Sequence, residues 1–108
     1  MFNFNYYKEI DVNQVSLDEY IIEKNIKKID FLKIDTEGSE YEIILGAVKN
    51  IKNIKLILFE HHFDDMILKE YKFSDINNFL IQNNFKQVFK IKMPFRKTFE
   101  YIYLNKTY

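Results

Sequence analysis

The 108-residue chain has no cysteine, two glycines and one proline. Without cysteine it can form no disulfide framework, no cysteine-ligated zinc site and no thiol nucleophile. Because glycine occurs only at Gly38 and Gly46, a glycine-rich loop for a phosphate group or a dinucleotide is also excluded. Several common kinds of site are therefore ruled out by composition alone.

Charge and hydropathy argue against two further classes of protein. Lys plus Arg and Asp plus Glu number 16 each, so the formal net charge is zero and a strongly basic nucleic-acid binder is not expected. No apolar run approaches the roughly 18–20 residues of a membrane span. Residues 1–7 have neither the positive start nor the long apolar core of a signal peptide. We therefore expect a cytoplasmic protein without nucleic-acid or membrane partners.

The residues that are abundant indicate a folded chain. Hydrophobic residues make up 47% and charged residues 30%, which is typical of a globular protein rather than a disordered one. The length allows one domain at most. Aromatic residues reach 18%, and each buried ring hides roughly 150–250 Å², so a short chain has enough bulk for a core.

The first part of the chain predicts a helix. Ser16 and Glu19 form an S-x-x-E pattern, the capping box that opens many helices. Positive charges favour a helix C-terminus, so we expect this helix to end near Lys27 and Lys28. The preceding residues 10–15 are ambiguous, with a short strand as one interpretation.

A strand, a turn and a second helix follow. Residues 29–35 are mostly apolar with β-branched content, which is typical of a buried strand, and residues 36–38 form the turn. A second capping box over residues 39–42 opens the helix. Gly46 is expected at its C-terminal cap in the left-handed region, although residues 47–48 could extend the helix by another turn.

The second half of the chain continues the alternation. We expect a buried strand over residues 55–60, a loop over 61–72, a helix capped by Ser74 and stopped at residues 83–84, and two strands over 85–91 and 99–104 joined by a turn at Pro94. The last two strands form an antiparallel pair. The order helix–β–α–β–α–β–β predicts an α/β fold, with a parallel sheet covered by helices and closed by that pair.

Candidate chemistry follows the first two strands. Asp35 and Glu37 come after one strand, and Glu60 and His61 close the next. Ligands of open parallel sheets bind outside the carboxyl ends of the strands, so these side chains would share one crevice if the strands are neighbours. They would serve as a general base, a clamp for a substrate hydroxyl or ligands of a divalent metal. Helix capping at Asp35 and a solvated loop at His61 are the alternatives, and we assign no metal ligand.

Residues 29–47 resemble the signature of the FkbM family of S-adenosylmethionine-dependent methyltransferases. The strand, turn and helix of that family read roughly I-D-x-L-K-I-D-x-E-G-x-E-x-x-x-L-x-G-A. Residues 15–21 are similar to the L-D-x-Y/F segment before that strand, and residues 57–62 resemble the next strand, which ends in an acid and often a histidine. The resemblance covers residues 12–63 well.

The resemblance implies a class I, Rossmann-like methyltransferase fold, a seven-stranded and mostly parallel sheet with one antiparallel strand near its edge. Residues 1–108 would form a single partial domain, the C-terminal half with strands four to seven. The implied reaction moves a methyl group from S-adenosylmethionine to a hydroxyl oxygen of a sugar or another secondary metabolite. In that reaction Asp35 and Glu37 orient or deprotonate the acceptor, while Glu60 and His61 line the same pocket.

One part of the family pattern has no counterpart in the sequence. The family's first strand, its acidic glycine-rich turn (D-x-G-A-N-x-G) and its strand ending in an acid for the ribose are not found. We therefore expect no main cofactor site, no catalysis by these residues alone, and an unpaired edge on strand 29–35.

Three interpretations stay open. In the first, an N-terminal half on another chain completes a methyltransferase. In the second, the chain is a non-catalytic remnant or a module that binds a small-molecule or glycan acceptor. In the third, it is an assembly module whose free strand edge pairs with a second copy or another chain.

Overall fold

The computed structural model describes residues 15–36, 38–63 and 69–108. Along the chain these ranges form α1 (Leu17–Glu23), β1 (Ile29–Ile34), α2 (Glu40–Leu45), the 3-10 turn η1 (Ile51–Asn53), β2 (Ile54–His62), α3 (Phe73–Gln82), β3 (Phe85–Lys92) and β4 (Thr98–Asn105). The strand expected over residues 10–15 falls, apart from Val15, outside the described residues. No helix within the described ranges is long and apolar enough to cross a membrane.

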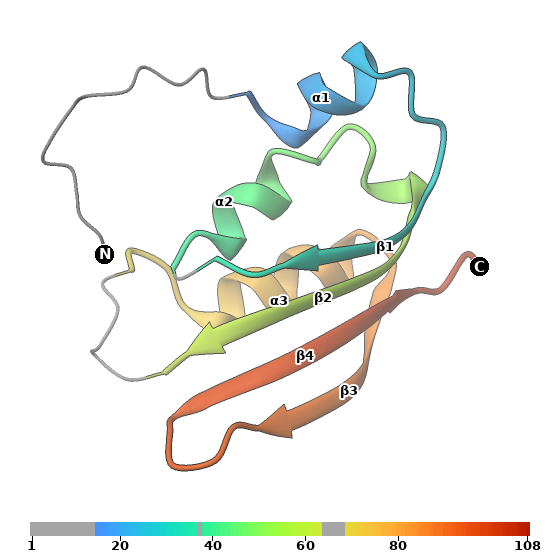
Figure 1. Cartoon of the computed structure of the whole chain (residues 1–108). Coiled ribbons are helices and arrows are strands. Elements are labelled where there is room, and N and C mark those ends of the chain that lie inside the picture. The colour runs from blue at the N-terminus through green and yellow to red at the C-terminus, as the bar shows by residue number, and fades with distance from the viewer. Residues whose placement is uncertain (1–14, 37, 64–68) are drawn as a thin grey trace, which may run out of the picture.

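The strands form one mixed sheet in the order β1–β2–β4–β3 (Figure 1). β1 and β2 are parallel neighbours, with Ile34 opposite Phe59. β4 lies between β2 and β3 and is antiparallel to both. The α/β class and the antiparallel final pair are confirmed. The expectation of a mainly parallel sheet is wrong for these four strands, because β4 inserts beside β2 and makes two of the three pairings antiparallel.

The core lies between the sheet and the helices that cover one of its faces (Figure 1). Ring stacking contributes to it, since the Phe59 ring lies 5.5 Å from Tyr101 and 5.7 Å from Tyr103, centroid to centroid. The fully buried apolar side chains of the core include Ile44 of α2, Ile76 and Leu80 of α3, Ile57 and Phe59 of β2, and Tyr103 of β4. Ile76 and Leu80 thus form the inner face of α3.

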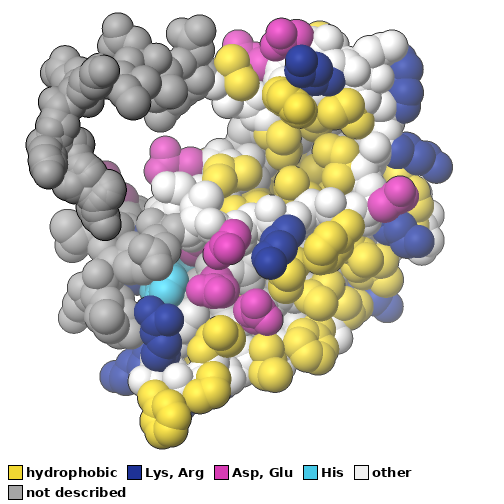
Figure 2. Space-filling model, viewed as in Figure 1, with side chains coloured by type: hydrophobic (Ala, Val, Ile, Leu, Met, Phe, Trp, Pro, Cys, Tyr) yellow, Lys and Arg dark blue, Asp and Glu magenta, His cyan; other side chains and the backbone are white. Residues whose placement is uncertain are grey.

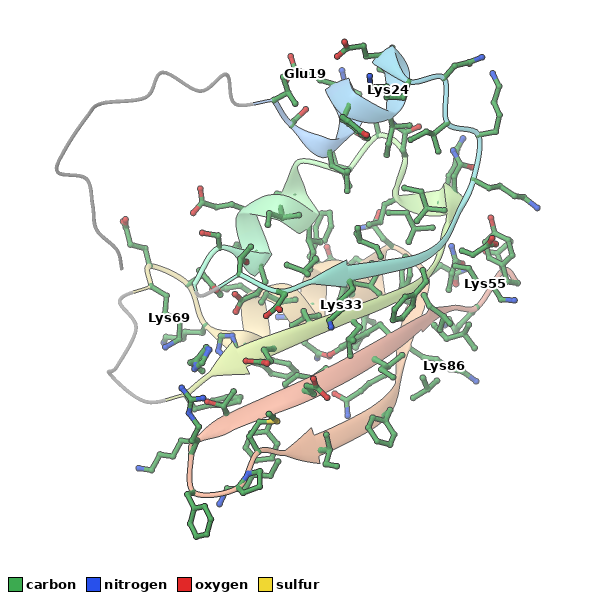
Figure 3. The ribbon with its side chains drawn as sticks, viewed as in Figure 1. Glu19, Lys24, Lys33, Lys55, Lys69 and Lys86 are labelled. Atoms are coloured by element: carbon green, nitrogen blue, oxygen red, sulfur yellow. The ribbon has the colours of Figure 1, made fainter. Side chains whose placement is uncertain are left out.

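The opposite face of the sheet, called here the open face, has no helix over it among the described elements. Strand alternation and register place on it Phe31 and Lys33 of β1, Leu56, Leu58 and Glu60 of β2, Glu100, Ile102 and Leu104 of β4, and Phe89 and Ile91 of β3. Phe31 is 50% exposed and Phe89 and Ile91 are each 47% exposed. Figure 2 shows apolar side chains gathered over much of this face with basic and acidic ones among them, and Figure 3 shows Lys33 projecting from it.

α1 begins where the sequence predicts and ends earlier. Ser16 Oγ accepts a hydrogen bond from the backbone N–H of Glu19 at 3.1 Å, and the Glu19 carboxylate accepts one from the Ser16 N–H at 2.8 Å, so the capping box is confirmed. The helix ends at Glu23 rather than near residues 27–28. Asn25 takes a positive φ of 54°, and this left-handed residue turns the chain toward β1.

α2 lies between the predicted cap residues, Ser39 and Gly46, but neither cap has the expected geometry. Ser39 makes no side-chain capping bond, so the second capping box is wrong. Gly46 has φ −69°, which is right-handed helical and not left-handed. After α2 the chain continues in turns, which are closed by hydrogen bonds such as the one from Ala47 N–H to Ile44 O at 3.0 Å. Gly46 instead contacts α1 through its backbone, since its carbonyl accepts a hydrogen bond from the Asp18 N–H at 2.8 Å. A Cβ at Gly46 would lie at ordinary van der Waals distance, 3.5 Å, from the Leu17 nitrogen.

β2 and α3 have boundaries that differ from expectation by one or two residues. β2 continues to His62, into the segment predicted as loop. α3 is capped at Lys72, whose backbone N–H donates to Asp75 at 2.8 Å, and Ser74 lies inside the first turn instead of capping it. The predicted stop after α3 is confirmed, and Asn84 has φ 73°.

The Asp18 carboxylate fastens α1 to the segment that follows α2. It accepts hydrogen bonds from the backbone N–H groups of Lys49 at 2.9 Å and Asn50 at 3.1 Å, and from Asn50 Nδ2 at 2.7 Å. The Asp18 N–H donates in turn to the carbonyl of Gly46 at 2.8 Å. Asp18 is only 7% exposed, so these bonds are shielded from water.

We expect Asp18→Ala to lower the free energy of unfolding by about 2–3 kcal/mol, since hydrogen bonds to a charged group contribute about 1.5–3 kcal/mol. Urea denaturation followed by circular dichroism measures this. Glu23→Ala, which removes an exposed carboxylate from the same helix, is the control and should change little. Equal effects of the two substitutions would contradict the anchoring role of Asp18.

Candidate functional site

The carboxyl ends of β1 and β2 meet at one edge of the sheet, as their parallel pairing requires. Ile34 pairs with Phe59, so Asp35 and Glu60 are the next residues on the two neighbouring segments, on the side of the open face. Asp35 is exposed and Glu60 is partly exposed. Glu37 lies outside the described residues. The sequence therefore correctly places Asp35 and Glu60 at a common edge.

His61 does not join Asp35 and Glu60. Successive side chains of a strand point to opposite faces, so His61 lies beneath the helices while Glu60 faces the open side. The expectation that Glu60 and His61 line one pocket is wrong for this reason. The same edge of the sheet instead carries two groups, one on each face.

The group beneath the helices is built on a buried Glu–His pair. His61 Nδ1 lies 2.9 Å from Glu40 Oε2, and each residue is 1% exposed. Glu40 is the first residue of α2, and the turn after β1 brings it over the end of β2. The sequence predicts for Glu40 only a place within a capping box. Its place in the E-G-x-E run was the signal that could have identified it.

Aromatic rings enclose the imidazole of His61. Phe63 packs edge-on with its ring centroid 4.7 Å from the imidazole, and the rings of Tyr71 and Phe73 lie at 5.7 and 5.8 Å. His61 also lines a surface pocket of 480 Å³ together with Tyr71, Lys72 and other residues between β2 and α3. Figure 3 shows Lys69, another residue of this pocket, at the same end of the sheet. The histidine thus has an apolar surround with access to a pocket.

Electrostatics favour an ionised carboxylate at Glu40. Burial raises the pKa of Glu40, but its interactions with His61 and with the nearby Tyr71 hydroxyl outweigh burial and lower this pKa below the ordinary 4.5. The pKa of Tyr71 is raised, first by burial and then by the adjacent Glu40 charge. Tyr71 is therefore a neutral proton donor across the physiological range, beside a permanently charged acceptor.

Unsatisfied polar atoms gather at this edge. Within the described ranges, the buried side-chain atoms without a hydrogen-bond partner are Thr36 Oγ1, Glu40 Oε1, His62 Nε2 and Tyr71 OH. All four residues stand on segments at the carboxyl end of β1 or β2. Buried polar atoms are nearly always paired, so this concentration makes the edge a candidate site for a polar ligand.

The group on the open face is acidic. Glu60 stands directly opposite Glu100 of β4, and His62 Nε2 approaches Glu60 Oε1 at 3.7 Å. His62 Nδ1 shares a hydrogen bond of 3.0 Å with Thr98 Oγ1. Figure 2 shows acidic side chains clustered here beside a histidine. Among the described residues no three potential ligands gather closely enough to hold a metal ion.

We expect Glu40→Gln to destabilise the fold in a pH-dependent way. Because the folded-state pKa of Glu40 is lowered, the ionised carboxylate contributes stability above pH 4.5, and this contribution is lost as the pH falls further. The difference in unfolding free energy between wild type and variant should reach up to about 3 kcal/mol near pH 7 and shrink in acid. The groups that face this carboxylate are His61 and Tyr71.

Chemical denaturation at pH 3 to 8 measures that difference. Glu42→Gln makes the same charge change at an exposed site on the same helix and serves as the control. A Glu40→Gln deficit that is constant across the range would show that the carboxylate charge contributes nothing.

The comparison with protein families identifies the family of the chain. A family model described as the FkbM domain of methyltransferases matches residues 2–87, which is most of the chain. No curated protein and no solved structure gives a significant match. The resemblance predicted from residues 29–47 is confirmed, and the match extends on both sides of residues 12–63. The chain therefore belongs to the FkbM methyltransferase family.

Proposed function

We propose that this chain is part of a methyltransferase that transfers a methyl group from S-adenosylmethionine to a hydroxyl oxygen of a sugar or another secondary metabolite. Family membership supports the methyl transfer and implies this donor. The proposed location of the acceptor site rests on the cluster of buried polar atoms without hydrogen-bond partners at the ends of β1 and β2. A hydroxyl group, which both donates and accepts hydrogen bonds, is a suitable partner for such atoms.

The strand order supports a class I fold, of which the chain would form the C-terminal half. β4 is antiparallel to both of its neighbours and lies one strand in from the sheet edge at β3. The resemblance implies one antiparallel strand in that position. Residues 1–108 would then be a single partial domain.

The described residues do not fit the main site of S-adenosylmethionine. Gly38, with φ 89°, belongs to the turn before the six-residue α2, and Gly46 is used for the contact with α1. Neither glycine lies in a glycine-rich turn that would admit the donor closely. The donor site is proposed to come from an N-terminal half, which would cover the open face and pair with the free edge of β1.

In this proposal the residues at the strand ends contact the acceptor. Asp35 and the undescribed Glu37 orient or deprotonate the acceptor hydroxyl. Glu60 neighbours Asp35 on the open face, while His61 reaches the acceptor from beneath the helices. Because the two faces are separate, substitutions at Asp35 and His61 test different contacts.

The second candidate function is a binding or assembly module without catalysis. The apolar open face favours it, because exposed contiguous apolar area marks protein interaction sites. A second copy of the chain would cover that face in a symmetric dimer. Sedimentation velocity separates the candidates: a dimer that forms with increasing concentration supports assembly, whereas a 13.3 kDa species at all concentrations removes it.

We expect no heat of binding when S-adenosylhomocysteine is titrated into the 108-residue chain, since the described glycines build no donor site. Thermal unfolding of the same sample checks that the chain is folded. Mixing with a separately expressed N-terminal half of a family member should restore both binding and methylation. Saturable binding by the chain alone would overturn the assignment of the donor site, and a folded but inactive mixture would count against catalysis.

We expect Asp35→Ala to lower turnover in the completed enzyme by about 10²-fold, which is typical for loss of a group that positions a reactant. Its folding stability should stay close to wild type, because Asp35 is exposed. Asp30→Ala, an exposed substitution at the other end of β1, is the matched control and should keep full activity. Unchanged turnover in Asp35→Ala would reassign Asp35 to a structural role.

A further inference from the structure

We propose that Glu40 is a positioning residue that fixes the tautomer of His61, so that His61 Nε2 takes the proton of the acceptor hydroxyl. This inference rests on the proposed function. It assigns a role to Glu40, which sequence analysis did not place in the site. Of the two roles proposed above for Asp35 and Glu37, it leaves them the orientation of the acceptor and gives the removal of the proton to His61.

The first argument is the geometry of the pair. Glu40 Oε2 and His61 Nδ1 are 2.9 Å apart, and both side chains are almost completely removed from water. They come from α2 and β2, two elements that pack on each other in the core. The imidazole ring is further held by the ring of Phe63 at 4.7 Å. His61 is thus fixed from two sides.

The second argument is the chemistry of a carboxylate at Nδ1. A neutral imidazole carries one N–H and one lone pair, and an ionised carboxylate accepts only. The carboxylate of Glu40 therefore requires the proton on Nδ1 and leaves the lone pair on Nε2. The same carboxylate stabilises the imidazolium that forms when Nε2 takes a proton, as in other carboxylate–histidine pairs.

The third argument is the position of the remaining nitrogen. His61 lines the pocket with Tyr71, Lys72 and Ser74. Because Glu40 holds Nδ1, Nε2 is the ring nitrogen that is left for a ligand in this pocket. A ligand hydroxyl bound there donates to Nε2. In the proton step the O–H bond breaks, the proton moves to Nε2, and the oxygen keeps the electron pair as the nucleophile.

The Tyr71 hydroxyl completes the arrangement. It lies near Glu40 and, like Glu40 Oε1, has no hydrogen-bond partner in the described part of the chain. Both atoms are therefore available to a ligand hydroxyl or to each other after a small movement.

Nitrogen-15 NMR of the uniformly labelled 108-residue chain at pH 8 tests the tautomer directly. His61 and His62 are the two histidines of the sequence, and a His62→Gln spectrum assigns the signals. We expect His61 Nδ1 to resonate as a protonated nitrogen and Nε2 as an unprotonated one. In Glu40→Gln a mixture of tautomers should appear, whereas Glu42→Gln, an exposed substitution on the same helix, should leave the spectrum unchanged.

A wild-type His61 that carries its proton on Nε2 would overturn the proposal, even if Glu40→Gln does not fold. An unchanged tautomer in a folded Glu40→Gln would overturn it as well. In the completed enzyme, Glu40→Gln should lower kcat by about 10–100-fold with little change in KM, and Glu40→Asp should recover part of the loss. An inactive completed enzyme with the expected tautomer would count against the proposed function and not against the role of Glu40.

Discussion

The parallel pairing of β1 and β2 is the constraint on which the rest of the structure depends. It brings the ends of two strands, far apart in the sequence, to one edge, and it requires α2 to cross over between them. The crossover lays the first residue of α2 over the end of β2. The contact between Glu40 and His61 follows from this topology and not from any local pattern.

Because successive side chains of a strand point to opposite faces, the two faces of the sheet carry different chemical groups at that edge. Glu60 and His61 are adjacent in sequence, yet they belong to different surroundings, one beside the acidic Glu100 and the other among aromatic rings. A site of this kind offers a solvated acidic side and a dry, ordered side. Differences in burial between neighbouring residues therefore separate their chemical roles.

The sequence predicts the elements well and their contacts poorly. The capping box at Ser16 and the stop at Asn84 are local signals, and both are confirmed because they depend on a few adjacent residues. The cap at Ser39 and the left-handed Gly46 are wrong, since packing of α1 against the end of α2 sets the backbone there. The anchoring role of Asp18 has no local sequence signal, because its hydrogen-bond partners lie more than thirty positions away.

The place of β4 between β2 and β3 has a consequence for how the chain reaches its fold. β2 pairs along most of its length with residues 98–105, so its second neighbour comes later in the chain than both α3 and β3. Until then β2 presents a free edge rich in apolar side chains, which is the condition in which unfinished sheets associate wrongly. Asn105 completes the closure, because its Nδ2 donates to the carbonyls of Lys52 and Ile54. Because β3 is made before the strand that joins it to β2, this sheet cannot form strand by strand in chain order.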